Sequence, residues 1–291
     1  MIRNPIIKRN PEDFHLNSTL HSHYMEVNMY ETMNQPIPDV GAYLRRIGMA
    51  SAPEVSLAGL NALIWAHQTH VPFEDLDVYF TRRPVSLELP ALFDKVVVRR
   101  RGGYCYELNA LFARLLQDLG FDVRRVFCRV VRGRDFLPPC AHQAIVAAFG
   151  EDMYFCDVGF GGPMPAGALP IGDGVGGDVR GEYFRIDRFD DYWWTMSRDA
   201  SDGRREAVLQ FNTFPQTPQE FLAANMKCAL DPESLFVNRL LVNLRTADGA
   251  LSVTDDALTV RRGGEVRTTH LENDAALRQA LTSRFGIDMT A

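Results

Sequence analysis

The stretch RRGGYCYELNALFARLLQDLG, residues 100–120, predicts a helix whose first turn carries a cysteine. After Cys105 the apolar residues recur three and four positions apart, which places them on one face of a helix. Gly120 follows the last of them, at the position where a glycine commonly ends a helix. We therefore expect a helix that begins near Cys105 and ends at Gly120.

Two glycines, Gly102 and Gly103, separate this helix from an extended run at Val96 to Val98. Because glycine has no side chain, the pair predicts a loop whose backbone another molecule can approach. The free N–H groups at a helix start favour negative charge, and the thiolate is the reactive form of cysteine. Cys105 is therefore a candidate nucleophile. The alternative is an inert buried thiol, because free cysteine is among the most buried residue types.

Composition and charge exclude several classes of protein. The chain has 291 residues, 46% of them hydrophobic and 23% charged, which is typical of a soluble globular protein with two or three compact units. The net charge of −6 argues against a nucleic-acid partner. No apolar run is long enough to span a membrane, and the N-terminal stretch lacks the apolar segment of a secretory signal, so we expect a cytoplasmic protein. The five cysteines favour neither a disulfide framework nor a zinc ribbon.

The pattern along the chain divides it into an extension and three units of an α+β protein. Residues 1–36 are polar and aperiodic, and their contribution to an oligomer contact, such as a homodimer, stays open. Helical spacing dominates residues 37–120, and short β-like runs dominate residues 121–225. Residues 226–291 mix helical patterns with a hairpin at a second RRGG, residues 261–264. We expect a helical bundle, then an antiparallel sheet or small barrel, then an α+β closing unit.

The segment CAHQAIVAAFGEDMYFCDVGFGG, residues 140–162, predicts a β-hairpin. Its two β-like runs flank Gly150 and Glu151, which form a two-residue turn with glycine first. Such a turn pairs Phe149 with Asp152 and thereby sets the register of the whole hairpin.

With that register, His142 and Asp157 become diagonal neighbours on one face, about 7–8 Å apart between backbones. A histidine that is oriented by a carboxylate can accept the proton of a thiol. Cys105, His142 and Asp157 thus form a candidate triad of nucleophile, base and orienter. A slip of one residue would move Asp157 to the other face, and a histidine in a β-run is often a satisfied core residue.

A metal site is the competing interpretation of Cys140, His142 and Cys156. Strand alternation places Cys140 and His142 on one face and Cys156 on the other, and no fourth ligand is evident. We therefore expect no metal.

Together these motifs resemble those of the bacterial arylamine N-acetyltransferases. The signature around the family's nucleophile is similar to RRGGYCYELN, residues 100–109, and its aspartate motif is similar to DVGFG, residues 157–161. HQTHVPFEDLDV, residues 67–78, and YLRRIG, residues 43–48, match segments that precede the nucleophile. The resemblance covers roughly residues 38–285.

The resemblance implies a helical bundle, a β-barrel and an α/β lid, with a cysteine-protease-like triad where the first two meet. It assigns Cys105, His142 and Asp157 as acyl-accepting nucleophile, base and orienter. It also implies ping-pong transfer of an acetyl group from acetyl-CoA, the co-substrate, to an arylamine, arylhydroxylamine or hydrazine, with no bound cofactor. Phe73 and Phe160 match aromatic positions that line the family's acceptor pocket, and plain core packing is their alternative role.

Two features near the triad leave alternatives open. Arg101 and Glu107 are expected to support the nucleophile loop, although Glu107 could simply complement the helix dipole. The stretch CAHQA, residues 140–144, departs from the family, which commonly has threonine or serine before its histidine and longer aliphatics after it. An amide synthase or another acyltransferase that uses a propionyl, malonyl or biosynthetic thioester therefore stays open. A thiol hydrolase and a non-catalytic binding protein are the remaining alternatives.

Overall fold

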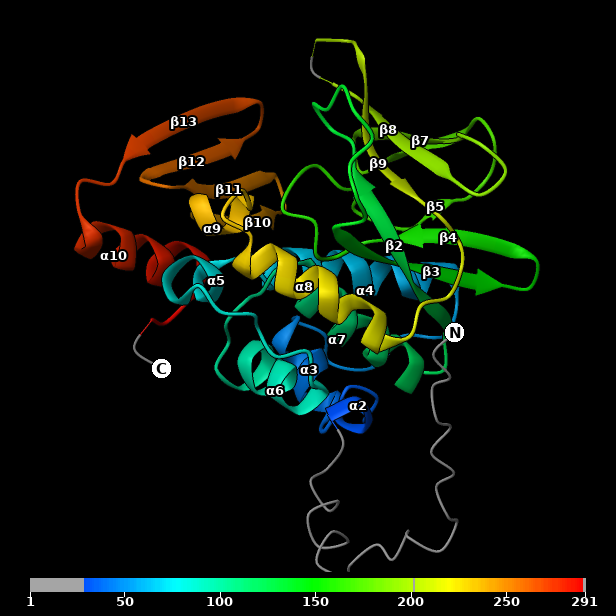
Figure 1. The fold of residues 1–291 in the computed structure, drawn as a ribbon, viewed down its shortest axis with the longest axis horizontal. Coiled ribbons are helices and arrows are strands. Elements are labelled where there is room, and N and C mark those ends of the chain that lie inside the picture. Colours follow the sequence, from blue (N-terminus) through cyan, green and yellow to red (C-terminus); the bar gives the residue numbers. More distant parts are fainter. Residues whose placement is uncertain (1–28, 201, 290–291) are drawn as a thin grey trace, which may run out of the picture.

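The computed structural model describes residues 29–200 and 202–289, which form a helical unit, a barrel-like sheet and a second, smaller sheet (Figure 1). The helical unit lies below the two sheets in this view. Most of the expected extension, residues 1–28, lies outside the described residues. Its last part does not stand apart from the helical unit, because the Met33 side chain is 1% exposed and Arg114 Nη1 donates to Asn34 O at 3.0 Å.

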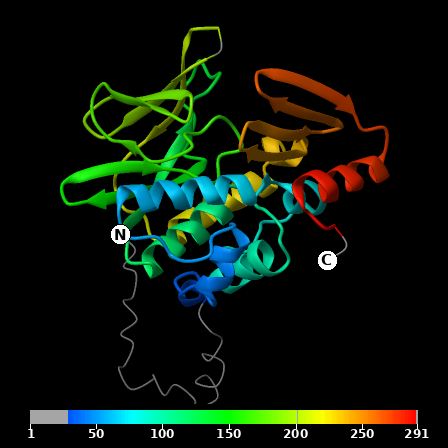
Figure 2. The same cartoon turned by 180° about the vertical axis from the view of Figure 1, so that it is seen from behind.

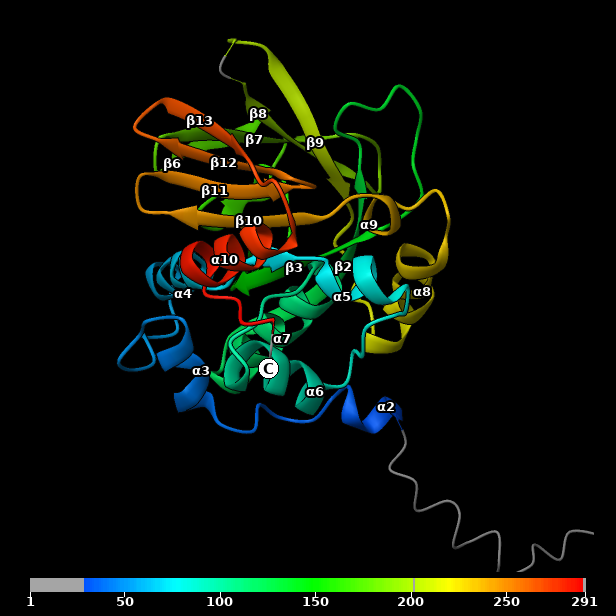
Figure 3. The ribbon, with the colours of Figure 1, turned by 90° about the vertical axis from the view of Figure 1, so that its left-hand side faces the viewer.

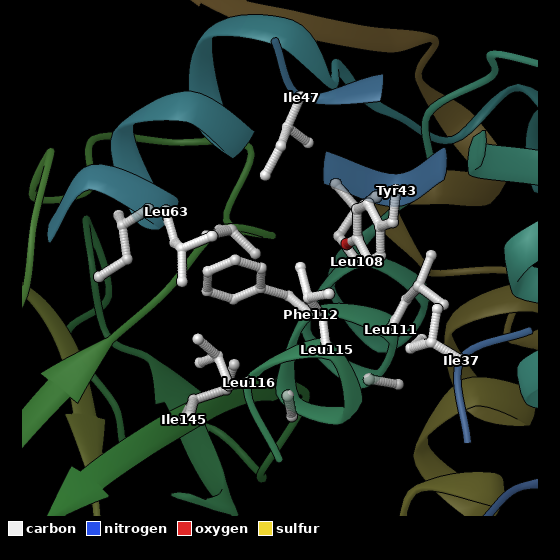
Figure 4. Packing of buried hydrophobic residues seen from close by; sticks show 14 of the residues in the cluster. Ile37, Tyr43, Ile47, Leu63, Leu108, Leu111, Phe112, Leu115, Leu116 and Ile145 are labelled. Carbon is white, nitrogen blue, oxygen red and sulfur yellow. The ribbon is translucent and has the colours of Figure 1, made fainter. Parts of the chain in front are cut away.

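The helical unit packs around one long amphipathic helix, α7 (Cys105–Asp118). Figure 4 shows leucines and a phenylalanine of α7 meeting side chains from α3, α4 and the barrel strand β3. The surrounding helices are α2 (Met29–Thr32), α3 (Val40–Arg46), α4 (Leu57–His70), α5 (Leu76–Thr81) and α6 (Leu89–Phe93), followed by the π-helical turn η2 (Asp94–Val98).

The ends of α7 confirm the helix that the sequence predicts. The helix begins at Cys105, and Gly120 follows its last turn with a φ of 93°. Gly120 N donates to Gln117 O at 3.0 Å, and Phe121 N donates to Leu116 O at 2.9 Å. This pair of bonds is the Schellman motif, which requires the left-handed conformation that glycine adopts without strain.

The prediction of an extended run at Val96 to Val98 is wrong, because these residues belong to η2. Val96 and Val97 are buried in the helical core, and this burial outweighs the preference of valine for strands. The π-helical turn continues α6 and places the buried Lys95 among carboxylates: its Nζ lies 2.7 Å from the half-buried Asp77 and 2.7 Å from the buried Glu107. Single π-turns inside helices are frequent at functional sites.

The central unit is a nearly closed antiparallel barrel, as expected. Its strand order is β5-β4-β3-β2-β9-β8-β7-β6, and β5 lies close to β6 and β7 at the two ends of the row. The strands are β2 (Asp122–Val130), β3 (His142–Phe149), β4 (Asp152–Cys156), β5 (Leu169–Pro170), β6 (Val175–Val179), β7 (Glu182–Arg188), β8 (Trp194–Asp199) and β9 (Arg205–Phe211).

The β3–β4 hairpin has the register that its turn predicts. Phe149 pairs with Asp152 across Gly150, whose φ is 64°. The pairing ends at Ile145 and Cys156, so the chain after β4 leaves the sheet beside the start of β3.

The closing unit is a five-stranded sheet that includes one strand from the helical unit. The strand order is β1-β10-β11-β12-β13, and Figure 3 shows α10 packed below this sheet. The boundary expected between residues 225 and 226 falls inside α8, because the barrel strands end at Phe211 and helices follow. The elements are β1 (Phe73–Glu74), β10 (Leu241–Thr246), β11 (Gly249–Thr254), β12 (Ala257–Arg262), β13 (Glu265–His270), η3 (Pro218–Glu220), α8 (Phe221–Leu230), α9 (Leu235–Asn238) and α10 (Asp274–Phe285).

Helix α4 runs beneath both sheets, as the view from behind shows (Figure 2). Its Gln68 Nε2 donates to Asp157 O and Pro165 O, both at 2.9 Å, and its Asn61 Oδ1 accepts from Ala168 N at 2.7 Å. The helix therefore fixes the loop that follows β4. Among the described residues, no helix has the length and apolar character needed to cross a membrane.

Candidate active site

Cys105 is the first residue of α7, and it is 2% exposed. The preceding residue, Tyr104, is tied to the helix by its N–H, which donates to Glu107 Oε2 at 3.0 Å. Its hydroxyl group donates to the side chain of Asn225 in α8, and Cys228 of the same helix lies in the buried cluster that contains Cys105. Helix α8 therefore covers the start of α7 (Figure 1).

Gly102 and Gly103 do not open the backbone to another molecule, as the sequence suggested, because both are buried against the chain itself. A Cβ atom on Gly102 would lie 2.0 Å from the carbonyl oxygen of Pro72, and one on Gly103 would lie 2.7 Å from Glu107 Oε2. Glu74 N donates to Gly103 O at 2.9 Å. The glycines thus admit strand β1, which packs directly onto the nucleophile loop.

His142 and Asp157 form a buried hydrogen bond. His142 Nε2 lies 2.6 Å from Asp157 Oδ2, and the two residues are 2% and 0% exposed. The hairpin brings the two residues near each other, because His142 begins β3 and Asp157 directly follows β4. They are not the diagonal pair of a ladder that the register predicted, since the pairing of β3 with β4 ends at Ile145 and Cys156.

The other oxygen of Asp157 is held by α7 and by its own loop. Asp157 Oδ1 accepts from Asn109 Nδ2 at 2.9 Å and from Gly159 N at 2.8 Å. Asn109 lies one turn after Cys105, and its Nδ2 also donates to Gln143 O at 2.6 Å. Asn109 therefore connects the nucleophile helix to both strands that carry the histidine and the aspartate.

The loop after Asp157 passes directly against Cys105. A Cβ atom on Gly159 would lie 2.9 Å from the Cα atom of Cys105 and 2.9 Å from Asn109 Nδ2. Only glycine therefore fits at this position. The structure thus brings the three residues of the expected triad to one place, at the junction of the helical unit and the barrel.

Burial raises the pKa of the Cys105 thiol well above its ordinary value, and the nearby Cys228 and Asp157 raise it further. The backbone N–H groups of Gln143 and Tyr106 lower this pKa but do not offset the burial. The N–H of Tyr106 at the helix start thus favours the thiolate, as expected, but burial has the larger effect on this pKa. A thiolate at this position needs a proton acceptor beside it.

Phe73 and Phe160 both lie at this junction. The Phe160 ring is half-buried, and its centroid is 5.2 Å from that of the His142 imidazole in an edge-to-face arrangement. Phe73 lies in the same buried cluster as Cys105, with its ring centroid 6.3 Å from that of Phe236 in α9. No sequence pattern singles out Phe236, which adds a third aromatic side chain, from the closing unit.

Arg101 and Glu107 belong to a buried group of charges beneath the nucleophile loop. Arg101 Nη2 lies 2.9 Å from both Glu74 Oε1 and Asp77 Oδ1, and Lys95 Nζ donates to Glu107 Oε1 at 2.7 Å. Burial raises the pKa of Glu107 to about 7, against the lowering effect of Lys95. The cluster joins β1, α5, η2 and α7, which are the elements that surround the loop.

Arg46 is a loop contact that the sequence reasoning missed. Its guanidinium donates to Val96 O at 2.9 Å and to Arg100 O and Arg101 O, both at 3.2 Å. The sequence could have indicated this role, because Arg46 is a charged residue on the buried face of the short helix α3. Asn109, a polar residue on the apolar face of α7, could have been found in the same way. A buried polar side chain needs hydrogen-bond partners, and both residues donate hydrogen bonds to backbone carbonyl groups around the site.

The metal interpretation gains no support from the geometry. In the part of the chain that the structure describes, no group of three or more His, Cys, Asp and Glu side chains is arranged to hold a metal ion.

Comparison with known proteins identifies the family. The model of an N-acetyltransferase family matches residues 56–291. The arylamine N-acetyltransferase of Mycolicibacterium smegmatis is 35% identical, with 86% of this chain and 92% of the relative covered, and that of Escherichia coli K12 is 32% identical, with 86% and 89% covered. The solved M. smegmatis enzyme superposes with a TM-score of 0.81 at 34% identity, covering 87% of this chain and 93% of that one. The structure of a Mycobacterium marinum arylamine N-acetyltransferase in complex with CoA superposes with a TM-score of 0.81 at 31% identity, covering 87% of this chain and 94% of that one. The chain therefore belongs to the arylamine N-acetyltransferase family.

Proposed function

We propose that this protein transfers the acetyl group of acetyl-CoA to an aromatic amine, arylhydroxylamine or hydrazine through an acetyl-Cys105 intermediate. The observation that carries the proposal is the 2.6 Å bond between His142 Nε2 and Asp157 Oδ2, made beside the first turn of α7. This bond leaves the second imidazole nitrogen available for a proton from the nucleophile, which is the arrangement that a thiol triad requires.

In the first half-reaction Cys105 gives its proton to His142, and the thiolate attacks the acetyl carbonyl carbon. Asp157 holds the imidazole in one orientation and stabilises the imidazolium that forms. The backbone N–H groups of Tyr106 and Gln143, which lie beside the thiol, are candidate donors to the oxyanion. The intermediate then collapses, the imidazolium returns its proton to the sulfur of CoA, and the acetyl group stays on Cys105.

In the second half-reaction the amine attacks the thioester and His142 removes a proton from its nitrogen. The Cys105 thiolate leaves, and the amide is released. Because the first product departs before the acceptor binds, the kinetics are ping-pong. Phe73 and Phe160 are proposed to line the acceptor site, where aromatic walls favour flat amines and exclude the water that would hydrolyse the thioester.

Arg101 and Glu107 are proposed to support the nucleophile loop rather than to contact CoA, because the described charges around them are already paired with one another. A cytoplasmic location is supported by the five cysteines, all of which are free thiols. A homodimer stays a proposal that light scattering of the full chain would test.

The intact mass of the protein tests the mechanism. After acetyl-CoA alone we expect one acetyl adduct, which disappears when an aromatic amine is added. Cys105→Ala should carry no adduct, whereas the matched variant Cys140→Ala should keep it. Asp157→Asn should stay folded and react slowly with an alkylating agent at Cys105. No adduct on a wild-type protein whose Cys105 is still rapidly alkylated would reject acetyl-CoA as the donor and favour another acyl thioester.

A further inference from the structure

Gln143, the residue after His142, has an unusual environment for an amide side chain. It is 0% exposed, and neither its Nε2 nor its Oε1 has a hydrogen-bond partner. Among the described residues, it is the one side chain in which two buried polar atoms lack partners. An amide in this situation carries a free-energy cost, which a ligand with matching hydrogen-bonding groups would remove.

The position of Gln143 on β3 makes the amide still less expected. Ile145 and Ala147, the next residues on the same face, are buried in the hydrophobic core against α7, where Figure 4 shows Ile145 beside Leu116. A leucine or methionine at position 143 would continue this apolar row. The apolar packing on this face of β3 therefore gives no structural reason for an amide at position 143.

The backbone of Gln143 lies next to the nucleophile. Its carbonyl oxygen accepts from Asn109 Nδ2 at 2.6 Å, and its backbone N–H faces the Cys105 sulfur. Across the sheet, Gln143 pairs with Phe127, which packs against the buried cluster that contains Cys105 and Tyr106.

The charges around the amide favour a neutral ligand. Asp157, the hydrogen-bond partner of His142, lies close to Cys105, and a carboxylate at this position disfavours an added anion. Arg125, the cation on the same sheet face, is opposite Ile145, and its pKa is lowered to about 10 by burial and by Arg114 of the helical unit. It therefore lies toward the C-terminal half of α7, away from Cys105. A carboxamide has two N–H donors and one acceptor oxygen, and a hydroxyl group, which both donates and accepts, can pair with either end.

We propose that the Gln143 carboxamide binds the acyl group that Cys105 carries, and that the protein prefers short acyl groups with a hydroxyl next to the carbonyl over hydrocarbon groups of the same size. This inference rests on the proposed acyl transfer through Cys105. It concerns which thioester is used best, whereas the acetyl adduct tests whether acyl transfer occurs.

The test compares glycolyl-CoA with propionyl-CoA, whose acyl groups differ by a hydroxyl in place of a methyl. Acylation of Cys105 is followed by quenched-flow intact mass, with acetyl-CoA as a reference. For the wild type we expect glycolyl transfer to be about tenfold faster than propionyl transfer. Gln143→Met, which keeps the length of the side chain and removes its hydrogen-bonding groups, should abolish or reverse this ratio.

The matched control is Gln210→Met. Gln210 is a 6% exposed barrel glutamine whose Oε1 also lacks a partner, and this variant should keep the wild-type ratio. A wild-type ratio of one or below would overturn the proposal, even if Gln143→Met failed to fold. An unchanged ratio in a folded Gln143→Met protein, or a preference for malonyl-CoA over glycolyl-CoA, would also overturn it. Absence of any acyl adduct would reject the proposed function itself.

Discussion

The tetrapeptide RRGG occurs at residues 100–103 and at residues 261–264, and the two copies have different structures. In the first copy the glycines are buried and neither has a positive φ. In the second copy the glycines form the β12–β13 turn with φ angles of 55° and 87°, and a Cβ atom on either would meet nothing within 4 Å. Glycine is therefore required for space in the first copy and for backbone conformation in the second.

The second arginine of each copy differs in the same way. Arg101 has 8% of its side chain exposed and contacts two carboxylates, whereas Arg262 has 78% exposed and pairs with Asp248 at the surface. The same four letters thus serve as a packed support of the site in one place and as a solvated turn in the other. Matched substitutions at equivalent positions measure the difference.

The largest effect is expected for Gly102→Ala. The new Cβ would lie 2.0 Å from a backbone oxygen, so either β1 or the nucleophile loop must move. We expect the free energy of unfolding to fall by about 4 kcal/mol or more, with loss of acetylation at Cys105. Gly263→Ala, in open space but with a positive φ, should cost about 1 kcal/mol. Urea unfolding of both variants checks this, and similar losses in the two would contradict the space argument.

Arg101→Met is expected to cause the second-largest loss of stability. The substitution leaves Glu74 and Asp77 short of one cation in a buried cluster, which typically costs about 3 kcal/mol. Arg262→Met removes a surface pair and should leave stability almost unchanged. Thermal unfolding would show the difference. Equal melting temperatures for Arg101→Met and wild type would mean that Arg101 does not support the loop.

Between pH 6 and pH 8, we expect the free energy of unfolding to depend on pH through groups near the first RRGG copy and not through those near the second. Burial raises the pKa of Asp75, next to Glu74, from 3.8 to about 8, partly opposed by the N–H of Leu241. Between these values the native state binds more protons than the unfolded state, so the free energy of unfolding falls as pH rises, by about 2 kcal/mol from pH 6 to pH 8.

Asp75→Asn should remove the Asp75 part of this slope and leave the smaller part that comes from Glu107, whose pKa burial raises to about 7. Asp248→Asn is the control near the second copy: the pKa of Asp248 is lowered by its hydrogen bond with Arg262, so its contribution is lost only in acid and the slope between pH 6 and pH 8 should persist. Urea unfolding at both pH values measures the slopes. A wild-type protein that becomes more stable as pH rises across this range would contradict the assignment to Asp75.

The smallest effects are expected at the first arginine of each copy, and they have opposite signs. Arg100 has a φ of 55°, so Arg100→Gly removes left-handed strain and should stabilise the protein by about 0.5 kcal/mol. Arg261 lies within strand β12, where Arg261→Gly should destabilise by about 0.5–1 kcal/mol. Chemical denaturation resolves the sign when both variants are measured together, and a shared sign would refute the comparison.

Much of the site could be predicted from local pattern. The helix that begins at Cys105, its end at Gly120 and the register of the β3–β4 hairpin all follow from spacing and turn chemistry, which act over a few residues. The local register indicated that His142 and Asp157 lie on neighbouring strands, whereas their contact also depends on hydrogen bonds from Asn109 and Gln68 that hold Asp157 after the pairing ends.

The partners of the site could not be predicted in this way. The position of Lys95 among the carboxylates could not be predicted, because the run of valines that follows it favours a strand. This segment is helical only because Val96 and Val97 are buried in the helical core. The role of Asn109 depends on an aspartate 48 residues away, and the packing of Gly102 depends on β1, so neither contact is encoded in a local pattern.

By itself, the sequence determined the elements, the triad candidates and the family, because periodicity, turns and motifs are properties of neighbouring residues. Tertiary structure decided what each glycine is for, which charges are buried together and that the Cys105 thiol needs a proton acceptor. The physical reason is that burial and close approach arise between segments distant in the chain. Free space at Gly102 and the pKa of Cys105 are set by those distant neighbours.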